Sequence, residues 1–274
     1  MKDDLGPALS LPPFKGRIDP EWDTPAVREA LSDCRRLFSD PGTRILLQGR
    51  NTVALIGLPI ETGWTRSVVL KEFGQRGVNR LKSLVLPSKA AKAWRGARAL
   101  VSRKIDTPPP IAYLESRQRG FIDRCYFLAA PVEDAREVRF LFRELQGEEL
   151  GALLSDLAAF LSECHDRGVV HKDLSDGNIL VKQGERGERL FYLLDTNRVR
   201  IRGRVGRWSR MRNLIRLGIP PDKQVFFLER YVKSGPLARS LVRWYKFNKA
   251  CYAGRVELKK KLRLKQLARK LGIQ

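Results

Sequence analysis

The 274-residue sequence predicts a fold of the α+β class, with a small sheet in the first half and mostly helices in the second. Two observations carry this prediction. Short runs of Val, Ile and Leu separated by Gly, Asn and Pro fill residues 43–73, whereas apolar residues recur at helical spacing over 150–161. A hydrophobic content of 43% can fill the core of one large domain or of two small lobes.

The first half is expected to begin with a loosely ordered arm, because residues 1–25 are rich in Pro and acidic groups and show no sustained periodicity. A helix is expected over 88–104, with Ser88 as its N-cap and the TPPP run at 107–110 barring its continuation. Five strands are predicted, the first three in a meander: 43–49, 52–58, 66–73, 110–116 and 123–134.

The second half is expected to begin with a helix over 150–168, which Gly168 ends. A β-hairpin follows, with strands at 178–182 and 189–195 around the turn QGERGE. After Asp195 the chain becomes basic, and three helical segments are expected: 208–218, 225–232 and 237–272.

Charge is very unevenly distributed along the chain. Residues 198–274 hold 23 Lys and Arg against three Asp and Glu, which accounts for nearly all of the net charge of +23. Such a local excess indicates a polyanionic neighbour, either nucleic acid, an anionic membrane face or a phosphorylated substrate, or else a solvated surface. The segment 237–274 reads as a basic amphipathic helix at a membrane surface, as a grip on nucleic acid, or as a helix packed on the protein's own second half.

The cysteines and the N-terminus indicate a cytosolic protein. Four cysteines lie far apart without a CxxC pair, so we expect ordinary thiols in a reducing compartment: Cys34, Cys125, Cys164 and Cys251. No apolar run approaches the roughly 18 to 20 residues that cross a bilayer. The first residues also lack the basic and then apolar regions of a secretory signal.

The stretch VVHKDLSDGNILVK, residues 169–182, concentrates reactive side chains between a helix end and a buried strand. A carboxylate at Asp173 can accept a hydroxyl proton, and Asn178 and Asp195 can hold a divalent metal, as phosphoryl transfer from a nucleotide requires. We expect His171 to fix this loop by bonding nearby backbone and not to act as a general base.

This H-x-D-x-x-x-x-N spacing, followed by a strand-borne Asp, resembles the catalytic and metal-binding loops of the protein-kinase-like superfamily. The run SVVLK, which ends at Lys71, matches the superfamily's Val-Ala-x-Lys. The resemblance implies a bilobal protein-kinase-like fold, with a small β-sheet N-lobe carrying one main helix and a mostly helical C-lobe. The expected divisions are a 1–25 arm, a 26–130 N-lobe, a 131–235 C-lobe with the catalytic loop and a 236–274 basic tail.

Several details favour a kinase that acts on a small molecule. Ser175 stands where protein kinases usually have a lysine, the sequence DTNR replaces DFG, and only 79 residues follow Asp195. The phrases SKAAKAWRGA, IDTPPPIAYLE, HKDLSDGNIL, FYLLDTNRVR and FLERYV are similar to the lipopolysaccharide core kinase family, which phosphorylates heptose or 3-deoxy-manno-octulosonic acid (Kdo).

This second resemblance, over 43–232, implies a bacterial enzyme that uses ATP and Mg²⁺ to phosphorylate a sugar hydroxyl of lipopolysaccharide core. It would be cytoplasmic and peripheral on the inner membrane. The expected partners are lipopolysaccharide core or a related anionic glycolipid, together with the anionic membrane surface that the basic tail would contact. Nucleic acid is the disfavoured partner.

The resemblance also assigns roles to single positions. Asp173 would be the catalytic base, Asn178 and Asp195 would hold Mg²⁺, and Lys71 would bind the nucleotide phosphates. The hinge that receives adenine through backbone groups would be 129–134, around Val132. Gly49 would lie in the loop that covers the nucleotide, although one Gly in such a run also fits an ordinary hairpin turn.

One departure from the family pattern bears on activity. The helix after Lys71 normally carries a glutamate that pairs with the lysine, but residues 88–104 contain no acid, with Ala93 and Arg95 near the expected place. Three acids could substitute: Glu72, Glu115 and Asp106. Strand alternation, however, directs Glu72 to the face opposite Lys71. The alternative function is therefore a pseudokinase or weak nucleotide binder acting as an envelope-associated scaffold.

Overall fold

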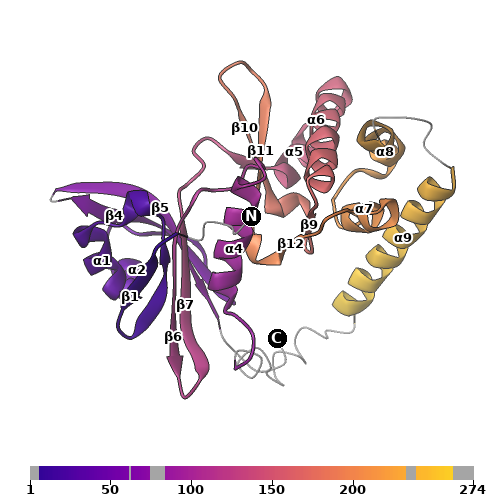
Figure 1. Ribbon diagram of the computed structural model, residues 1–274. Coiled ribbons are helices and arrows are strands. Elements are labelled where there is room, and N and C mark those ends of the chain that lie inside the picture. The colour runs from indigo at the N-terminus through magenta and orange to yellow at the C-terminus, as the bar shows by residue number, and fades with distance from the viewer. Residues whose placement is uncertain (1–5, 62, 75–83, 233–238, 262–274) are drawn as a thin grey trace. The chain divides into compact units, whose positions relative to one another are not determined.

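A computed structural model describes residues 6–61, 63–74, 84–232 and 239–261 of the chain (Figure 1). The described residues form two compact units. Unit 1 lies within Met1–Ser102 and Pro108–Val132, and unit 2 comprises Arg103–Thr107 and the described residues from Glu133 onward. The short segment 103–107, expected within the first half, belongs to unit 2 because Leu193 N donates to Asp106 O and the Thr107 hydroxyl donates to Leu193 O.

Unit 1 is built on an antiparallel sheet of seven strands (Figure 1). Their order in the sheet is β1 (Ala8–Leu11), β2 (Phe14–Ile18), β6 (Pro110–Gln118), β7 (Phe121–Ala129), β5 (Trp64–Phe73), β4 (Asn51–Glu61) and β3 (Arg44–Leu47). The predicted meander of three strands is confirmed, since β3 pairs with β4 and β4 with β5. The last predicted strand is shorter than expected, because β7 ends before Pro131.

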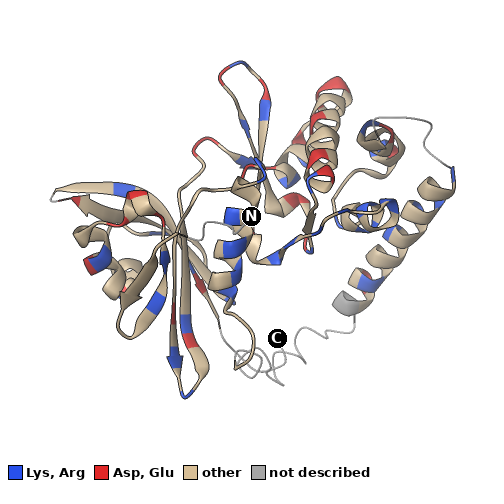
Figure 2. Ribbon diagram, in the orientation of Figure 1, with Lys and Arg blue, Asp and Glu red and all other residues tan. Residues whose placement is uncertain are grey.

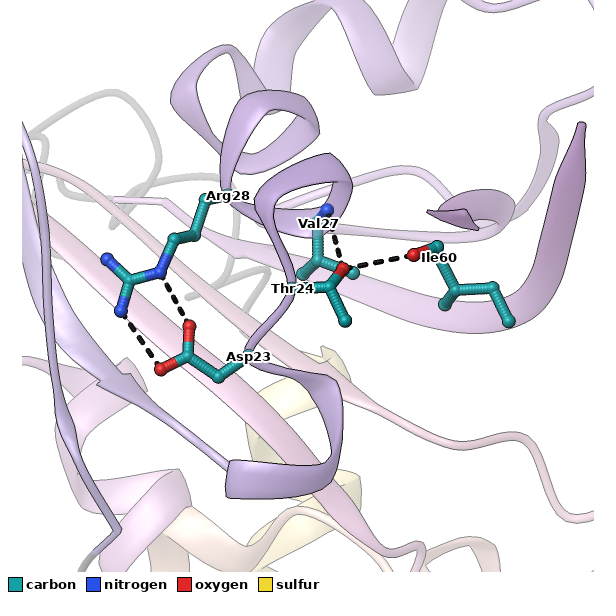
Figure 3. Close-up of polar contacts among 5 residues, drawn as sticks. All are labelled: Asp23, Thr24, Val27, Arg28 and Ile60. Carbon is teal, nitrogen blue, oxygen red and sulfur yellow. Dashed lines mark hydrogen bonds and ion pairs between the residues drawn. The ribbon is translucent and has the colours of Figure 1, made fainter. Parts of the chain in front are cut away.

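The prediction of a loosely ordered N-terminal arm is wrong for the residues that the structure describes. Strands β1 and β2 join the sheet next to β6, and helices α1 (Pro25–Ser32) and α2 (Cys34–Ser39) follow. Thr24 caps α1 by accepting from Val27 N, and its hydroxyl donates to Ile60 O of β4 (Figure 3). Asp23 and Arg28 form a two-bond ion pair beside this cap (Figure 3).

Helix α4 (Lys89–Val101) is the predicted helix of unit 1, and Ser88 caps it as expected by accepting from Ala91 N. The helix packs against β6 and β7 in a small cluster that includes Phe73, Ala90, Ala93, Ile122 and Cys125. A larger cluster packs α1 and α2 on residues of alternate parity, such as Leu70, Tyr126 and Leu128. The alternation of side chains along each strand therefore separates an α4 face from an α1–α2 face.

Unit 2 is mostly helical, as predicted. Its helices are α5 (Val138–Glu144), α6 (Gly147–Asp166), α7 (Arg207–Leu214), α8 (Gln224–Val232) and α9 (Arg239–Lys261). The predicted hairpin is present as β10 (Ile179–Gln183) and β11 (Arg189–Leu193), joined at its edge by β8 (Arg136–Glu137). A second small sheet pairs β9 (Val169–His171) with β12 (Val199–Ile201). The leucines of the predicted apolar stripe of α6 are buried, from Leu150 to Leu161.

Helix α9 carries much of the basic tail and packs on unit 2. Leu241 and Tyr245 are buried, and the rings of Trp208 of α7 and Trp244 lie edge to face with centroids 5.4 Å apart. The expectation of a helix packed on the protein's own second half therefore describes residues 239–261, while the rest of the tail lies outside the described residues. Within the described ranges, no helix is long and apolar enough to span a membrane.

Candidate active site

The loop that carries Asp173 follows β9, the short strand into which the chain turns at the end of α6. Gly168 has φ +76°, and a Cβ there would lie 2.0 Å from Arg202 O, so only glycine allows the chain to turn directly into β9. Strand β9 then pairs antiparallel with β12, which places His171 opposite Val199. The sequence thus delivers a polar loop from a rigid, buried strand.

His171 ties together the two segments predicted to carry the chemistry. Its Nδ1 accepts from Asp173 N at 3.3 Å, and its Nε2 lies 2.9 Å from Leu194 O and 3.3 Å from Asp195 O. Since carbonyl oxygens only accept, Nε2 carries the proton and the ring is neutral. Burial lowers the pKa of His171 from its ordinary value, which favours this neutral form. The expectation that His171 holds the loop by bonding backbone is confirmed.

Asn178 and Asp195 lie just beyond the paired ends of β10 and β11. Leu194 N donates to Asn178 O at 2.9 Å, and the Asn178 amide nitrogen donates to Asp173 O at 2.8 Å. Asp195 adopts left-handed backbone geometry, with φ +53°, and its carbonyl accepts from Arg198 N. The structure therefore gathers the loops of Asp173, Asn178 and Asp195 through shared backbone bonds.

The donor chemistry of these residues fits a magnesium ion. The Asn178 side chain uses its nitrogen on Asp173 O, so its amide oxygen is the atom that can face a cation, and Asp195 supplies a carboxylate. Magnesium prefers such hard oxygen ligands and retains several waters. In the part of the chain that the structure describes, three or more His, Cys, Asp or Glu side chains nowhere gather as a metal cluster. A magnesium held here would thus depend on few protein ligands.

A buried polar network supports β9 from three helices, and the sequence analysis missed it. The Asn213 amide nitrogen of α7 donates to His171 O at 2.6 Å, and Asn213 Oδ1 accepts from His165 Nε2 at 2.9 Å. His165 Nδ1 then accepts the Tyr231 hydroxyl of α8 at 2.6 Å. Burial lowers the pKa of His165 to about 4, so both of the chain's histidines are neutral near pH 7.

Arg216 was also missed by the sequence analysis, and it contacts the predicted base directly. Its Nη2 lies 2.7 Å from Asp173 Oδ1. In sequence it is one arginine among many in a basic region, so no local pattern singled it out.

Lys71 lies in unit 1 on the α4 face of the sheet. It pairs in register with Phe127, which pairs with Tyr113, and its Nζ lies 5.0 Å from the centroid of the Phe73 ring. Glu72 faces the other side of the sheet, where its negative charge adds to burial in raising the pKa of Tyr126. The expected separation of Lys71 and Glu72 is therefore confirmed.

The other two acids proposed to substitute for the helix glutamate lie in different places. Glu115 pairs in register with Cys125, whose side chain packs against α4, so Glu115 and Lys71 share one face of the sheet. Among the described residues, no hydrogen-bond donor reaches the buried Glu115 Oε2. Asp106 belongs to unit 2. Glu115 is therefore the candidate that the sheet places on the face of Lys71.

The remaining predicted positions flank these elements. Gly49 lies in the short turn between β3 and β4, where a Cβ would meet none of the described atoms within 4 Å, and this openness is equally compatible with an ordinary hairpin turn. Val132 is the last residue of the 108–132 segment of unit 1, and Glu133 is the first of the main segment of unit 2. The predicted hinge at 129–134 thus coincides with the passage of the chain between the units.

Comparison with known proteins identifies a family for this chain. The sequence profile of the Lipopolysaccharide kinase (Kdo/WaaP) family matches residues 78–222, more than half of the chain. This chain belongs to that family. The resemblance seen in the sequence is confirmed, and the protein is a kinase. Asp173, Asn178 and Asp195 lie within the matched range, whereas Lys71 and α9 lie outside it.

A solved structure supports the fold of this kinase. The chain is similar to the structure "WaaP in complex with acyl carrier protein", with a TM-score of 0.55 and 16% sequence identity. The similarity covers 79% of this chain and 90% of that chain. A comparison with curated protein sequences gives no match. The mixed helix and strand architecture of this chain therefore fits the fold of that structure.

Proposed function

We propose that this kinase uses ATP and Mg²⁺ to phosphorylate a sugar hydroxyl, on heptose or Kdo, of lipopolysaccharide core. The two units would act as the two lobes of a protein-kinase-like fold. The observation that carries the proposal is the double role of His171, which bonds both the Asp173 backbone and the Leu194–Asp195 backbone. One buried side chain thereby fixes the proposed base relative to a proposed metal ligand.

Each proposed residue has one task in the reaction. Asp173 accepts the proton of the acceptor hydroxyl as its oxygen forms a bond to the γ-phosphorus and the bond to ADP breaks. Asn178 and Asp195 hold Mg²⁺, which when bound neutralises the phosphate oxygens. Lys71 binds the nucleotide phosphates, the turn at Gly49 covers them, and backbone groups near Val132 receive adenine.

Phosphate transfer to an isolated core oligosaccharide tests the proposal. Purified protein with ATP and Mg²⁺ should add one phosphate, detected by mass spectrometry, and Asp173→Asn should lower turnover by about 100-fold or more, the usual contribution of a general base. Glu185→Gln, the same carboxyl-to-amide change on the exposed β10–β11 turn, should retain wild-type turnover. Wild-type turnover in Asp173→Asn would remove Asp173 as the base. No transfer by the wild type would favour the scaffold alternative.

The outer face of α9 supports a peripheral membrane position. Arg243, Lys246 and Arg255 are exposed on this helix, together with the apolar Phe247, which is 68% exposed. Figure 2 marks Lys and Arg positions of α9 in blue. Exposed basic and aromatic residues on one helix suit an anionic headgroup layer. Wild-type protein should sediment with phosphatidylglycerol vesicles and less with phosphatidylcholine vesicles, and Arg243→Gln with Lys246→Gln should weaken this binding. Equal sedimentation with both lipids would argue against it.

A protein partner is a second possibility, because the similar WaaP structure is a complex with acyl carrier protein. The strongly basic second half of this chain is suited to a partner of negative charge. Co-purification from cells that express both proteins, repeated at high salt, would establish or dismiss such a complex here.

A further inference from the structure

We propose that Arg216 is a positioning residue for the proposed base Asp173, and that helix α9 holds Arg216 in place through Lys249 and Tyr252. The inference rests on the proposed role of Asp173. It extends the phosphotransfer site to a helix that lies beyond the family match.

The contact between Arg216 and Asp173 constrains one oxygen of the carboxylate. Arg216 Nη2 lies 2.7 Å from Asp173 Oδ1, and both side chains are partly exposed, at 42% and 27%. With Oδ1 engaged, the carboxylate is fixed in one orientation and Oδ2 is the oxygen that can accept a proton from an acceptor hydroxyl. The guanidinium therefore does for the side chain of Asp173 what His171 does for its backbone.

Lys249 of α9 holds the backbone on both sides of Arg216. Its Nζ donates to Ile215 O at 3.3 Å and to Leu217 O at 2.5 Å. Burial lowers the pKa of Lys249 to about 8, so the ammonium stays mostly charged at pH 7. A half-buried ammonium on two carbonyls fixes the segment 215–217, in which Ile215 and Leu217, on either side of Arg216, are themselves buried.

Tyr252 supports the side chain of Arg216 from the same helix. The Arg216 guanidinium carbon lies 5.7 Å from the centroid of the Tyr252 ring, within the range of a cation–π contact. Tyr245, Lys249 and Tyr252 recur at intervals of four and three residues, so they share one face of α9. Backbone and side chain of Arg216 are thus held by one face of one helix.

Stability alone explains this arrangement poorly. A partly exposed ion pair contributes little to stability, yet a half-buried lysine and an aromatic ring both contact the residue that makes it. The geometry instead has the form of a support that fixes the direction of a reacting carboxylate.

Steady-state kinetics with ATP and core oligosaccharide test the inference. Arg216→Gln should lower kcat by about tenfold or more while the KM for ATP stays within about twofold, because only the orientation of the base changes. Arg216→Lys should recover part of kcat. Tyr252→Leu should lower kcat less than Arg216→Gln does, and Tyr252→Phe, which retains the ring, should behave as wild type. Arg239→Gln, at an exposed arginine of the same helix to which no role is assigned, is the matched control and should not change kcat.

The outcomes separate this inference from the proposed function. If Asp173→Asn is inactive while Arg216→Gln and Tyr252→Leu keep wild-type kcat, the positioning role is overturned and the base assignment stands. If Asp173→Asn keeps wild-type turnover, the base assignment itself fails. A rise in the KM for the acceptor at constant kcat in Arg216→Gln would also overturn positioning. Positioning would also be overturned if the loss of kcat in Arg216→Gln came with a fall in melting temperature and if Arg216→Lys did not restore part of kcat.

Discussion

In unit 2 the proposed site residues lie on loops that buried polar side chains hold, whereas in unit 1 Lys71 lies within a strand whose pairing fixes it. One side chain, His171, makes hydrogen bonds to the backbone of both the Asp173 loop and the Leu194–Asp195 segment. Lys71, in contrast, is placed by a backbone ladder to β4 and β7. Strand pairing tolerates the loss of single side chains, so the two regions should respond differently to substitution.

The largest effect is expected at His171. His171→Leu removes both hydrogen bonds and should lower kcat by roughly 100-fold or more, because misplacement of reacting groups by about 1 Å can cost that much. His171→Gln, which can still reach Leu194 O, and His171→Asn, which can still accept from Asp173 N, should retain intermediate activity. Kinetics at a temperature well below each variant's melting point measure this series.

The graded variants keep this prediction informative if His171→Leu folds poorly. Wild-type kcat in both His171→Gln and His171→Asn would mean that the loops do not depend on the histidine, and that the backbone ladder between β9 and β12 suffices to place them.

The next effect concerns acid. His165 has a folded pKa of about 4 against an ordinary 6.5, so the unfolded chain takes up the proton first as pH falls. The free energy of unfolding should therefore be level above pH 6.5 and fall by about 3 kcal/mol toward pH 4. Arg210, which lowers this pKa, and Asp166, which raises it, are the charged groups beside the ring.

Urea unfolding at a series of pH values checks this prediction. His165→Gln cannot titrate, so the slope between pH 6.5 and 5 should be smaller in this variant than in the wild type. His171 shifts in the same direction and should supply a residual slope. Identical slopes in the two proteins would show that His165 is not buried as a neutral ring. Both histidines lie in unit 2, so unit 1 should not share this acid sensitivity.

Local patterns predicted most of the framework because the relevant signals are short in range. The meander, α4 with its Ser88 cap, α6 and the β10–β11 hairpin all follow from periodicity and turn residues. The N-terminal strands were missed because β1 and β2 span only four and five residues, too few for an alternation to stand out.

Long-range contacts account for what the sequence could not predict at the candidate site. Asn213 and Arg216 contact β9 and its loop, and Tyr231 contacts His165. Each comes from a helix or turn dozens of residues away, and nothing in its immediate surroundings in the sequence marks it. The spacing of Tyr245, Lys249 and Tyr252 was a usable signal, since it predicts a buried face on α9. The many Lys and Arg residues around these positions made the segment look like a solvent-exposed basic helix, so this face was not predicted.

The smallest effect is expected in unit 1, where the sheet separates three charged residues by face. Lys71→Met should raise the KM for ATP about tenfold, since one charged hydrogen bond to phosphate is worth roughly 1.5 kcal/mol. Glu115→Gln should raise it less, because Glu115 shares the face of Lys71 from two strands away. Glu72→Gln is the matched control and should leave the KM unchanged, because Glu72 lies beside Tyr126 on the other face.

Initial rates over a range of ATP concentrations give all three values. A KM that rises in Glu72→Gln but not in Glu115→Gln would mean that strand alternation does not decide which acid acts on Lys71, and the contrast between a strand-built and a loop-built region would lose its basis.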